Sequence, residues 1–400
     1  MSKVFIVAKN EFYRYFISPL AYVYLICFLL LNSSISLYFG EIFTSGNASL
    51  KPMFDFLPWI YIIFIPGIAM RLWAEEFRNG TIMQIATIPV HINAFVWGKF
   101  IAAWSFCGLG LLLTFPLIIT LNILGFPDNP VILNSYLGAF LLAGTMLAIS
   151  QTASALTQNQ VVSLILSIFL NLIFMFSGLE YVLGFFRTFA PDYIVDLISS
   201  FSFLTHLSLF SLGNLQLHSL VFFISIIFLF NFLTSSIINI RTLGCSFFLK
   251  NKSFFGRCSV AILIFISFIG INLFANGLLK SLNIDFTEDK IFTLSSNSRK
   301  VLQNLPAVTT AKIYYSPILG QRDTQMRLAF DKLKTLLETY KNISDGKFNY
   351  QIFDPKPLSN IENMAISQGI QAIPLNDLNA AAYFGIVFTN ENGYSRTIPF

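Results

Sequence analysis

The sequence predicts a mostly α-helical membrane protein with six transmembrane helices, a seventh anchoring helix and a C-terminal α/β extracytoplasmic domain. Three observations lead to this prediction. The chain is 55% hydrophobic and only 11% charged, a balance typical of integral membrane proteins. Its first 279 residues contain long apolar runs. The remaining residues carry 13 Lys/Arg and 11 Asp/Glu and show alternating strand and helix signals.

Long, nearly uncharged runs are typical of transmembrane helices. We expect such helices at Pro19–Phe39, Phe54–Met70, Phe100–Phe126, Ser135–Ala155, Val161–Gly178, Ser219–Ile240 and Cys258–Leu279.

The distribution of charge between these runs predicts the topology. With a cytoplasmic N-terminus, ten of the 12 Lys/Arg in residues 1–279 fall inside, and only Lys51 and Arg187 fall outside. Cytoplasmic loops are enriched in Lys and Arg, so this orientation is favoured. Residues 280–400 are then periplasmic. The first apolar run is too long for a cleavable signal peptide and lacks a small-residue cleavage site. The expected location is therefore a bacterial inner membrane.

We expect four regions: a six-span domain at 1–242, a basic cytoplasmic linker at 243–257, the seventh helix at 258–279 and an external α/β domain at 280–400. Lys3–Ile17 alternates charged and aromatic residues and suggests an interfacial amphipathic helix. The alternative is a positively charged flank. The semi-apolar loop 179–218 is expected to carry short helices at the outer face.

The segment 71–99, which we call the coupling segment, is a charged island between two apolar runs. Charges near a bilayer centre cost about 2.5 to 3.5 kcal/mol, so this segment is expected at the membrane face. The predicted helix spans two turns, with Arg71 and Glu75 at ion-pair spacing. We expect Gly80 to end this helix, Thr81 to cap the next and Pro89 to end that one. The alternative is a plain solvated loop.

Other chemistries lack a signal. No phosphate-binding GxxxxGK[ST] motif occurs, so if ATP drives this protein, a separate subunit must bind it. The four cysteines suggest neither a disulfide framework nor a redox pair. His91, His206 and His218 are scattered and predict no metal site. No nucleophile–base pair and no nucleic-acid patch is found, and no directly bound cofactor is expected.

The first 242 residues resemble permease subunits of type-2 ABC exporters, and most closely the gliding-motility (Gld) type. The matching residues are Pro66, Met70-Arg71, Ala74-Glu75-Glu76, Gly80-Thr81, Thr87, Pro89-Val90 and Gly98-Lys99-Phe100, with Glu11, Phe16, Ser18-Pro19, Ala21-Tyr22, Leu156-Thr157 and Asn159-Gln160. In that family a partner ATPase docks on the segment after the second span and on the N-terminal helix. The resemblance implies an ATPase-coupling site at Arg71, Glu75, Glu76, Arg78, Gly80, Thr81 and Pro89.

Residues 258–400 resemble the companion gliding-motility auxiliary protein, which has one anchor and a periplasmic domain. The matching residues are Asp285–Lys290, Phe292–Ser295, Asp354-Pro355, Gly369–Gln371, Ile373–Leu375 and Ala382–Gly385. That family continues with a further domain. Either this chain is a fragment or the further domain is absent.

The order of strand and helix signals after residue 307 also looks thioredoxin-like. We expect strands at 308–316, 348–355, 381–390 and 394–400, with helices at 326–342 and 361–368. Ile373-Pro374 stands where that fold keeps a cis proline, and the isomer is left open. No Cys-x-x-Cys occurs, so thiol chemistry is excluded.

These features favour an ABC transporter permease that couples ATP hydrolysis on a separate cytoplasmic ATPase to export or movement of a substrate. It would work as a homodimer or heterodimer of permease units, in contact with membrane lipids and with a possible periplasmic envelope partner. The competing hypothesis is a membrane-anchored scaffold of an envelope or motility machine through which no solute passes. The substrate cannot be named from the sequence.

Overall fold

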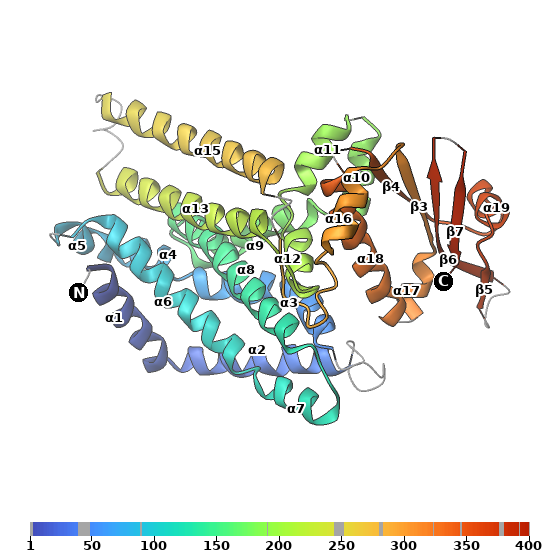
Figure 1. Ribbon diagram of the computed structural model, residues 1–400. Helices are drawn as coiled ribbons and strands as arrows, with labels where there is room; N and C mark the ends of the chain where they lie inside the picture. Colours follow the sequence, from blue (N-terminus) through green and yellow to red (C-terminus); the bar gives the residue numbers. More distant parts are fainter. Residues whose placement is uncertain are drawn as a thin grey trace. The chain divides into compact units, whose positions relative to one another are not determined.

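The computed structural model describes residues 3–38, 49–88, 90–189, 191–243, 252–279, 283–322, 324–344, 346–375, 380–391 and 393–399. The described residues form two compact units, the first ending at Phe286 and the second beginning at Thr287 (Figure 1).

The first unit is almost entirely helical. Its helices are α1 (Lys3–Ile17), α2 (Pro19–Tyr38), α3 (Lys51–Ala69), α4 (Ala74–Asn79), α5 (Thr81–Thr87), α6 (Ile92–Leu112), α7 (Pro116–Leu124), α8 (Asn129–Leu156), α9 (Gln160–Phe176), α10 (Glu180–Arg187), α11 (Asp192–Ser199), α12 (Phe203–Ser211), α13 (Leu217–Leu243) and α15 (Lys252–Leu278).

Five helical segments of the described chain are long and apolar enough to cross a membrane. They are Ala21–Tyr38, Lys51–Asn79, Ile92–Leu124, Asn129–Leu156 and Leu217–Thr242. The fifth expected span corresponds to Gln160–Phe176, which is apolar but shorter. The seventh corresponds to α15, in which Leu263–Gly277 is apolar. The chain is therefore a multi-pass membrane protein, and the number of spans stays a prediction.

The third expected span is not one continuous helix. Helix α6 ends at Leu112 and α7 begins at Pro116. Proline has no N–H to donate and fits the first turn of a helix, so the break falls just before it. The Thr114 hydroxyl donates to the Leu111 carbonyl at 2.6 Å inside this break. Because the hydropathy of residues 100–126 is uniform, the sequence does not indicate this break.

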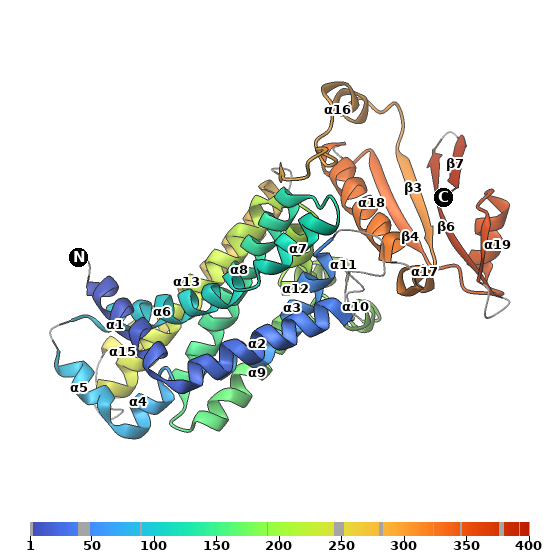
Figure 2. The same cartoon turned by 90° about the horizontal axis from the view of Figure 1, so that it is seen from below.

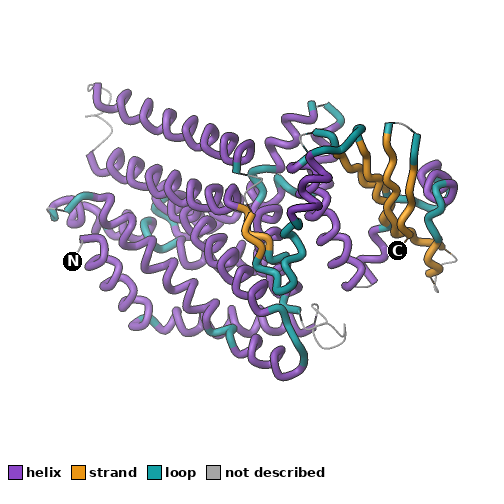
Figure 3. Tube along the Cα trace, viewed as in Figure 1, coloured by secondary structure: helices purple, strands orange, loops and turns teal. Residues whose placement is uncertain are grey.

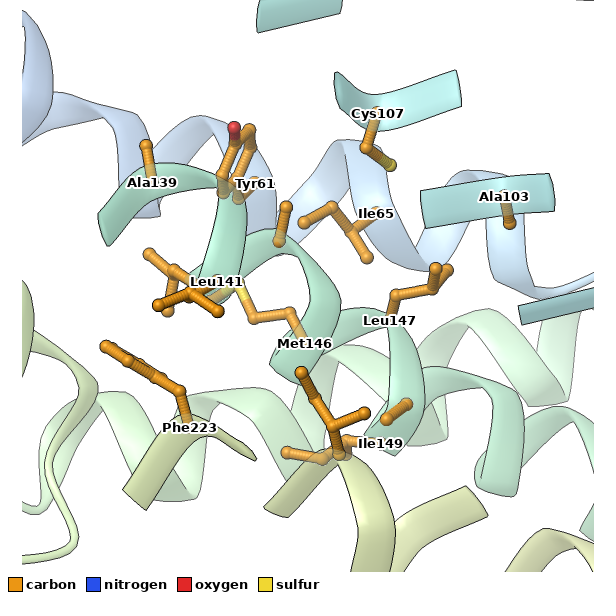
Figure 4. Packing of buried hydrophobic residues seen from close by; sticks show 14 of the residues in the cluster. Tyr61, Ile65, Ala103, Cys107, Ala139, Leu141, Met146, Leu147, Ile149 and Phe223 are labelled. Atoms are coloured by element: carbon orange, nitrogen blue, oxygen red, sulfur yellow. The ribbon is translucent and has the colours of Figure 1, made fainter. Parts of the chain in front are cut away.

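Helix α8 is the centre of the first unit. It packs against α3, α6, α9, α12 and α13, and most of its side chains are buried. Figure 4 shows Met146 and Leu147 of α8 between Ile65 of α3, Cys107 of α6 and Phe223 of α13. Movement of α8 would therefore disturb most of the bundle.

Small residues on α8 allow these close approaches. A Cβ at Gly138 would lie 2.6 Å from the Phe210 Cβ, and one at Gly144 would lie 2.7 Å from the Trp104 ring. Small residues at helix interfaces are the usual means by which membrane helices pack tightly. The Trp104 indole stacks on Phe140 at 4.4 Å and donates to the Phe140 carbonyl.

Helix α15 contacts the bundle along α13 and just beyond its own C-terminal end. It packs along α13, and the Asn272 amide donates to the Ser225 hydroxyl at 3.0 Å. Strands β1 (Asn214–Gln216) and β2 (Asn283–Asp285) pair antiparallel immediately beyond it, and Figure 3 shows this short ribbon within the helical unit. The chain leaving α15 is thus hydrogen-bonded to the chain entering α13.

Short helices occupy the loop 179–218, as the sequence predicts. They are α10, α11 and α12. The Ser202 hydroxyl caps α12 by accepting from the Thr205 N–H, a common stabilising arrangement at helix starts. The placement of this loop at the outer face stays a prediction.

The second unit contains a mixed sheet and four helices among its described residues. They are α16 (Ser296–Gln303), β3 (Thr309–Tyr315), α17 (Pro317–Arg322), α18 (Thr324–Ile343), β4 (Phe348–Phe353), α19 (Asn360–Ser367), β5 (Ala372–Leu375), β6 (Ala380–Asn390) and β7 (Ser395–Pro399). The strand order is β4-β3-β6-β5, with β7 also paired to β6. The expected β3, β4 and hairpin β6–β7, and the expected helices α18 and α19, are confirmed.

Helices cover both faces of this sheet (Figure 2). On one face Phe330 of α18 stacks on Tyr315 of β3 at 3.9 Å. On the other face Ala365 of α19 packs with Tyr314 and Tyr383. Two apolar layers therefore hold the sheet between them.

The thioredoxin-like description stays a prediction. Strand β3 is parallel to β4 and antiparallel to β6. Ile373-Pro374 lies on β5, which pairs with β6 rather than with β3. No cis peptide bond occurs among the described residues. The Ile373–Pro374 bond, whose isomer the sequence left open, is therefore trans.

Candidate functional site

The coupling segment contains a sharp break that the sequence did not predict. Helix α3 ends at Ala69 and α4 begins at Ala74, so Arg71 and Glu75 do not share a helix. The expected ion pair between them is absent from the described residues. The predicted pair assumed a continuous helix, and the break removes the i to i+4 geometry.

Ser154 of α8 holds this break in place. Its hydroxyl accepts from the backbone N–H groups of Trp73 and Ala74, each at 3.1 Å, and donates to the Met70 carbonyl at 3.1 Å. Helix ends leave backbone groups without intrahelical partners. Here a buried side chain from another helix supplies those partners, so α8 determines the angle between α3 and α4.

Lys99 of α6 fixes α4 from the other side. Its side chain is almost fully buried, at 4% exposure. The ammonium pairs with Glu76 Oε1 at 2.8 Å, donates to the Leu72 carbonyl at 2.9 Å and lies 4.8 Å from the Trp73 ring centroid. A buried ammonium needs such compensation. The sequence marks Lys99 only as part of the coupling segment and of the family resemblance, and does not reveal this central role.

Gly80 and Thr81 join α4 to α5. Gly80 adopts a left-handed conformation with φ of 73° and ends α4, as predicted. Thr81 does not cap α5, and this prediction was wrong. Its hydroxyl instead donates to Glu76 Oε2 in a short hydrogen bond. Glu76 is therefore bonded to α6 through Lys99 and to α5 through Thr81.

Two further polar contacts tie α4 to other helices. The Gln160 amide at the start of α9 donates to Glu75 Oε2 at 3.3 Å. The Arg241 guanidinium at the end of α13 lies 3.7 Å from the Phe77 ring centroid and donates to the Ala155 carbonyl at 2.6 Å. Gln160 belongs to the family resemblance, whereas nothing in the sequence marks Arg241 as a partner of α4.

The outward face of the α4–α5 segment is exposed. Arg78 is exposed and has no ion-pair partner among the described residues, and Met83 is 60% exposed. Ile88 follows α5 in an extended conformation. Pro89, the last residue of the predicted site, lies outside the described residues.

A cavity of about 820 Å³ opens between α1, α2, α3, α6 and the α4–α5 segment. Apolar walls come from residues such as Phe106, Ile85 and Phe95, and charged side chains gather at the coupling segment. Its charged lining residues are Glu11, Arg14, Arg71, Glu75, Glu76 and Lys99.

Two of the three histidines come together at α12. The His206 and His218 ring centroids are 5.3 Å apart. Burial lowers the pKa of His206 to about 4, against the opposing effect of its hydrogen bond to the Ser200 carbonyl. Nε2 donates to that carbonyl, so Nδ1 accepts from the Ser219 hydroxyl at 2.8 Å. No group of three metal-ligating side chains occurs in the part of the chain that the structure describes.

The bundle and its short α4–α5 segment define a polytopic membrane protein with one polar, multiply anchored element between its second and third apolar helices. Residues 8–178 match the family described as ABC-2 family transporter protein. Residues 288–389 match a domain of unknown function (DUF7088). No curated protein matches the chain. Residues 8–178 are thus similar to ABC-2 transporter proteins, and residues 288–389 are similar to a separate C-terminal domain.

Proposed function

We propose that this permease couples ATP hydrolysis on a separate cytoplasmic ATPase to export or movement of a substrate, and that the ATPase contacts the α4–α5 segment. The observation that carries the proposal is the anchoring of this segment. Ser154, Lys99 and Arg241 join it to α8, α6 and α13. A push on its outward face would therefore reach three long helices directly.

The residues of the α4–α5 segment then have three roles. Arg78 and Met83 present the exposed surface that an ATPase would contact. Glu76 and Thr81 act as positioning residues because their polar atoms bond within the permease. Gly80 supplies the bend that sets the two short helices apart.

The wider assembly follows from the same reasoning. Two permease units, identical or related, would line the substrate path in an inner membrane. The N-terminus would be cytoplasmic, and the C-terminal domain would be periplasmic and available to an envelope partner. ATP would be bound by the partner subunit. We infer from the matching motifs that the two halves are of the gliding-motility permease and auxiliary types.

Co-purification with a candidate ABC ATPase from the same organism tests the proposal. Arg78→Glu/Met83→Glu should reduce retained ATPase by about tenfold, since a charge reversal and a buried charge each cost over 1 kcal/mol at an interface. The matched control is Arg396→Glu, which reverses an exposed arginine on β7. If Arg78→Glu/Met83→Glu retained as much ATPase as the control, the docking surface would have to lie elsewhere. Wild-type protein that retains no ATPase would favour the scaffold hypothesis.

A further inference from the structure

The cavity beside the coupling segment has a charge pattern that identifies a ligand class. Of its six charged lining residues, three are acidic and three are basic. Arg14 pairs with Glu11 at 3.3 Å, and Lys99 pairs with Glu76 at 2.8 Å. Within each of these two pairs, the opposite charges neutralise each other.

Arg71 and Glu75 are the remaining charges. Arg71 has no hydrogen-bond or ion-pair partner among the described residues, and Glu75 accepts a single 3.3 Å hydrogen bond from Gln160. The break between α3 and α4 prevents these two side chains from pairing as they would on one helix. The cavity therefore offers one cation and one carboxylate with most of their hydrogen-bonding capacity unused.

The rest of the cavity is suited to hydrocarbon. Its wall includes Val23 of α2, which is 56% exposed, and Ile88, which is 45% exposed. The amphipathic helix α1 forms another side, and such helices lie at the boundary between headgroups and acyl chains. The volume of about 820 Å³ is within the range of sites that enclose a sizeable organic ligand.

We propose that this cavity binds a zwitterionic glycerophospholipid with a primary ammonium, its phosphate at Arg71 and its ammonium at Glu75. Arginine binds phosphate through charge-assisted hydrogen bonds, and an ammonium can donate to a carboxylate. An anionic lipid would leave Glu75 without a cation and meet no net positive charge. The acyl chains would lie against the apolar wall. This binding goes beyond ATPase coupling and does not require an ATPase.

Native mass spectrometry of the purified full-length protein, without ATPase, tests the assignment. Dioleoyl phosphatidylethanolamine, phosphatidylcholine and phosphatidylglycerol are supplied in equal amounts in detergent. We expect phosphatidylethanolamine to be retained about tenfold over phosphatidylglycerol, the difference of about one charge-assisted hydrogen bond. Phosphatidylcholine should bind less because its methylated ammonium cannot donate. Equal retention of all three lipids would overturn the proposal without the use of any variant.

Variants locate the site. Arg71→Gln should weaken retention of all three lipids about tenfold, and Glu75→Gln should abolish the preference for phosphatidylethanolamine. Arg396→Gln, an exposed arginine of β7, is the matched control and should change nothing. Soluble phosphoethanolamine at the same concentration should not displace the lipid. Displacement by it, or an unchanged preference in Glu75→Gln, would contradict the assignment.

Discussion

Lys99 lies where α6 passes the break between α3 and α4, and its ammonium contacts a carboxylate, a carbonyl and an aromatic ring. All three partners belong to residues 72–76. These three contacts, and not hydration, stabilise the Lys99 ammonium, because the surrounding helices exclude water. Removing the ammonium would leave the Glu76 carboxylate with Thr81 as its remaining side-chain partner.

Lys99→Met is expected to destabilise the protein by about 2 kcal/mol, less than the loss for a fully buried pair because the Glu76 side chain keeps 18% exposure. The double variant Lys99→Met/Glu76→Gln should recover part of that loss, since it leaves no unpaired charge. Apparent melting temperature in detergent measures both. Lys9→Met, at an exposed lysine of α1, is the control. A double variant less stable than the sum of the single variants would refute the pairing.

Ser154 provides the second test at the scale of one residue. Ser154→Ala removes a buried acceptor used by two backbone N–H groups, so we expect a loss of about 1–3 kcal/mol. Ser163→Ala is a closely matched control, because the Ser163 hydroxyl on α9 is buried without a hydrogen-bond partner in the described structure. Equal melting temperatures for the two alanine variants would show that the hydroxyl does not hold the break.

At the scale of elements, the sequence located the helices far better than their interruptions. Hydropathy placed α2, α3, α8, α9, α13 and α15 to within a few residues at most ends, because apolar length is a property of the local sequence. The break at residues 70–73 depends on Ser154, which is more than 80 residues away in the chain. Likewise the charges of the coupling segment were visible in the sequence, whereas Lys99 and Arg241 could be recognised as partners of residues 72–77 only once the helices were packed.

The bend between α4 and α5 depends on a backbone conformation that only glycine adopts readily. Gly80 has φ of 73°, and no heavy atom lies within 4 Å of the point that a Cβ would occupy. Gly80→Ala would therefore cost about 1 kcal/mol through backbone strain alone. We expect reduced ATPase retention in co-purification because the two short helices would reorient. Gly80→Asn should be milder, since asparagine tolerates this region.

Gly270→Ala on α15 is the control for that prediction. Gly270 is helical and also has open space around it, so alanine there should be neutral or slightly stabilising. Gly80→Ala with full ATPase retention would show that the angle between α4 and α5 does not matter for docking.

At the scale of the whole molecule, α13 joins features at its two ends. Arg241 at one end contacts Phe77 of α4. Asn214–Gln216, just before the other end, pairs with Asn283–Asp285 beyond α15. The permease helices and the chain leading to the second unit are therefore linked by one long helix. Residues 283–285, close to the end of the first unit, therefore belong to the same connected set of contacts as α4.

The distribution of Lys and Arg predicts that the α4–α5 segment and the C-terminal domain lie on opposite sides of the membrane. Cysteine labelling tests it directly. In a background without the four native cysteines, Met83→Cys and Arg396→Cys each introduce one exposed thiol. A membrane-impermeant maleimide applied to sealed cells with an accessible periplasm should label Arg396→Cys immediately and Met83→Cys only after the inner membrane is permeabilised. Labelling of both from one side would require an even number of crossings between them, which would contradict the five spans expected between Met83 and Arg396.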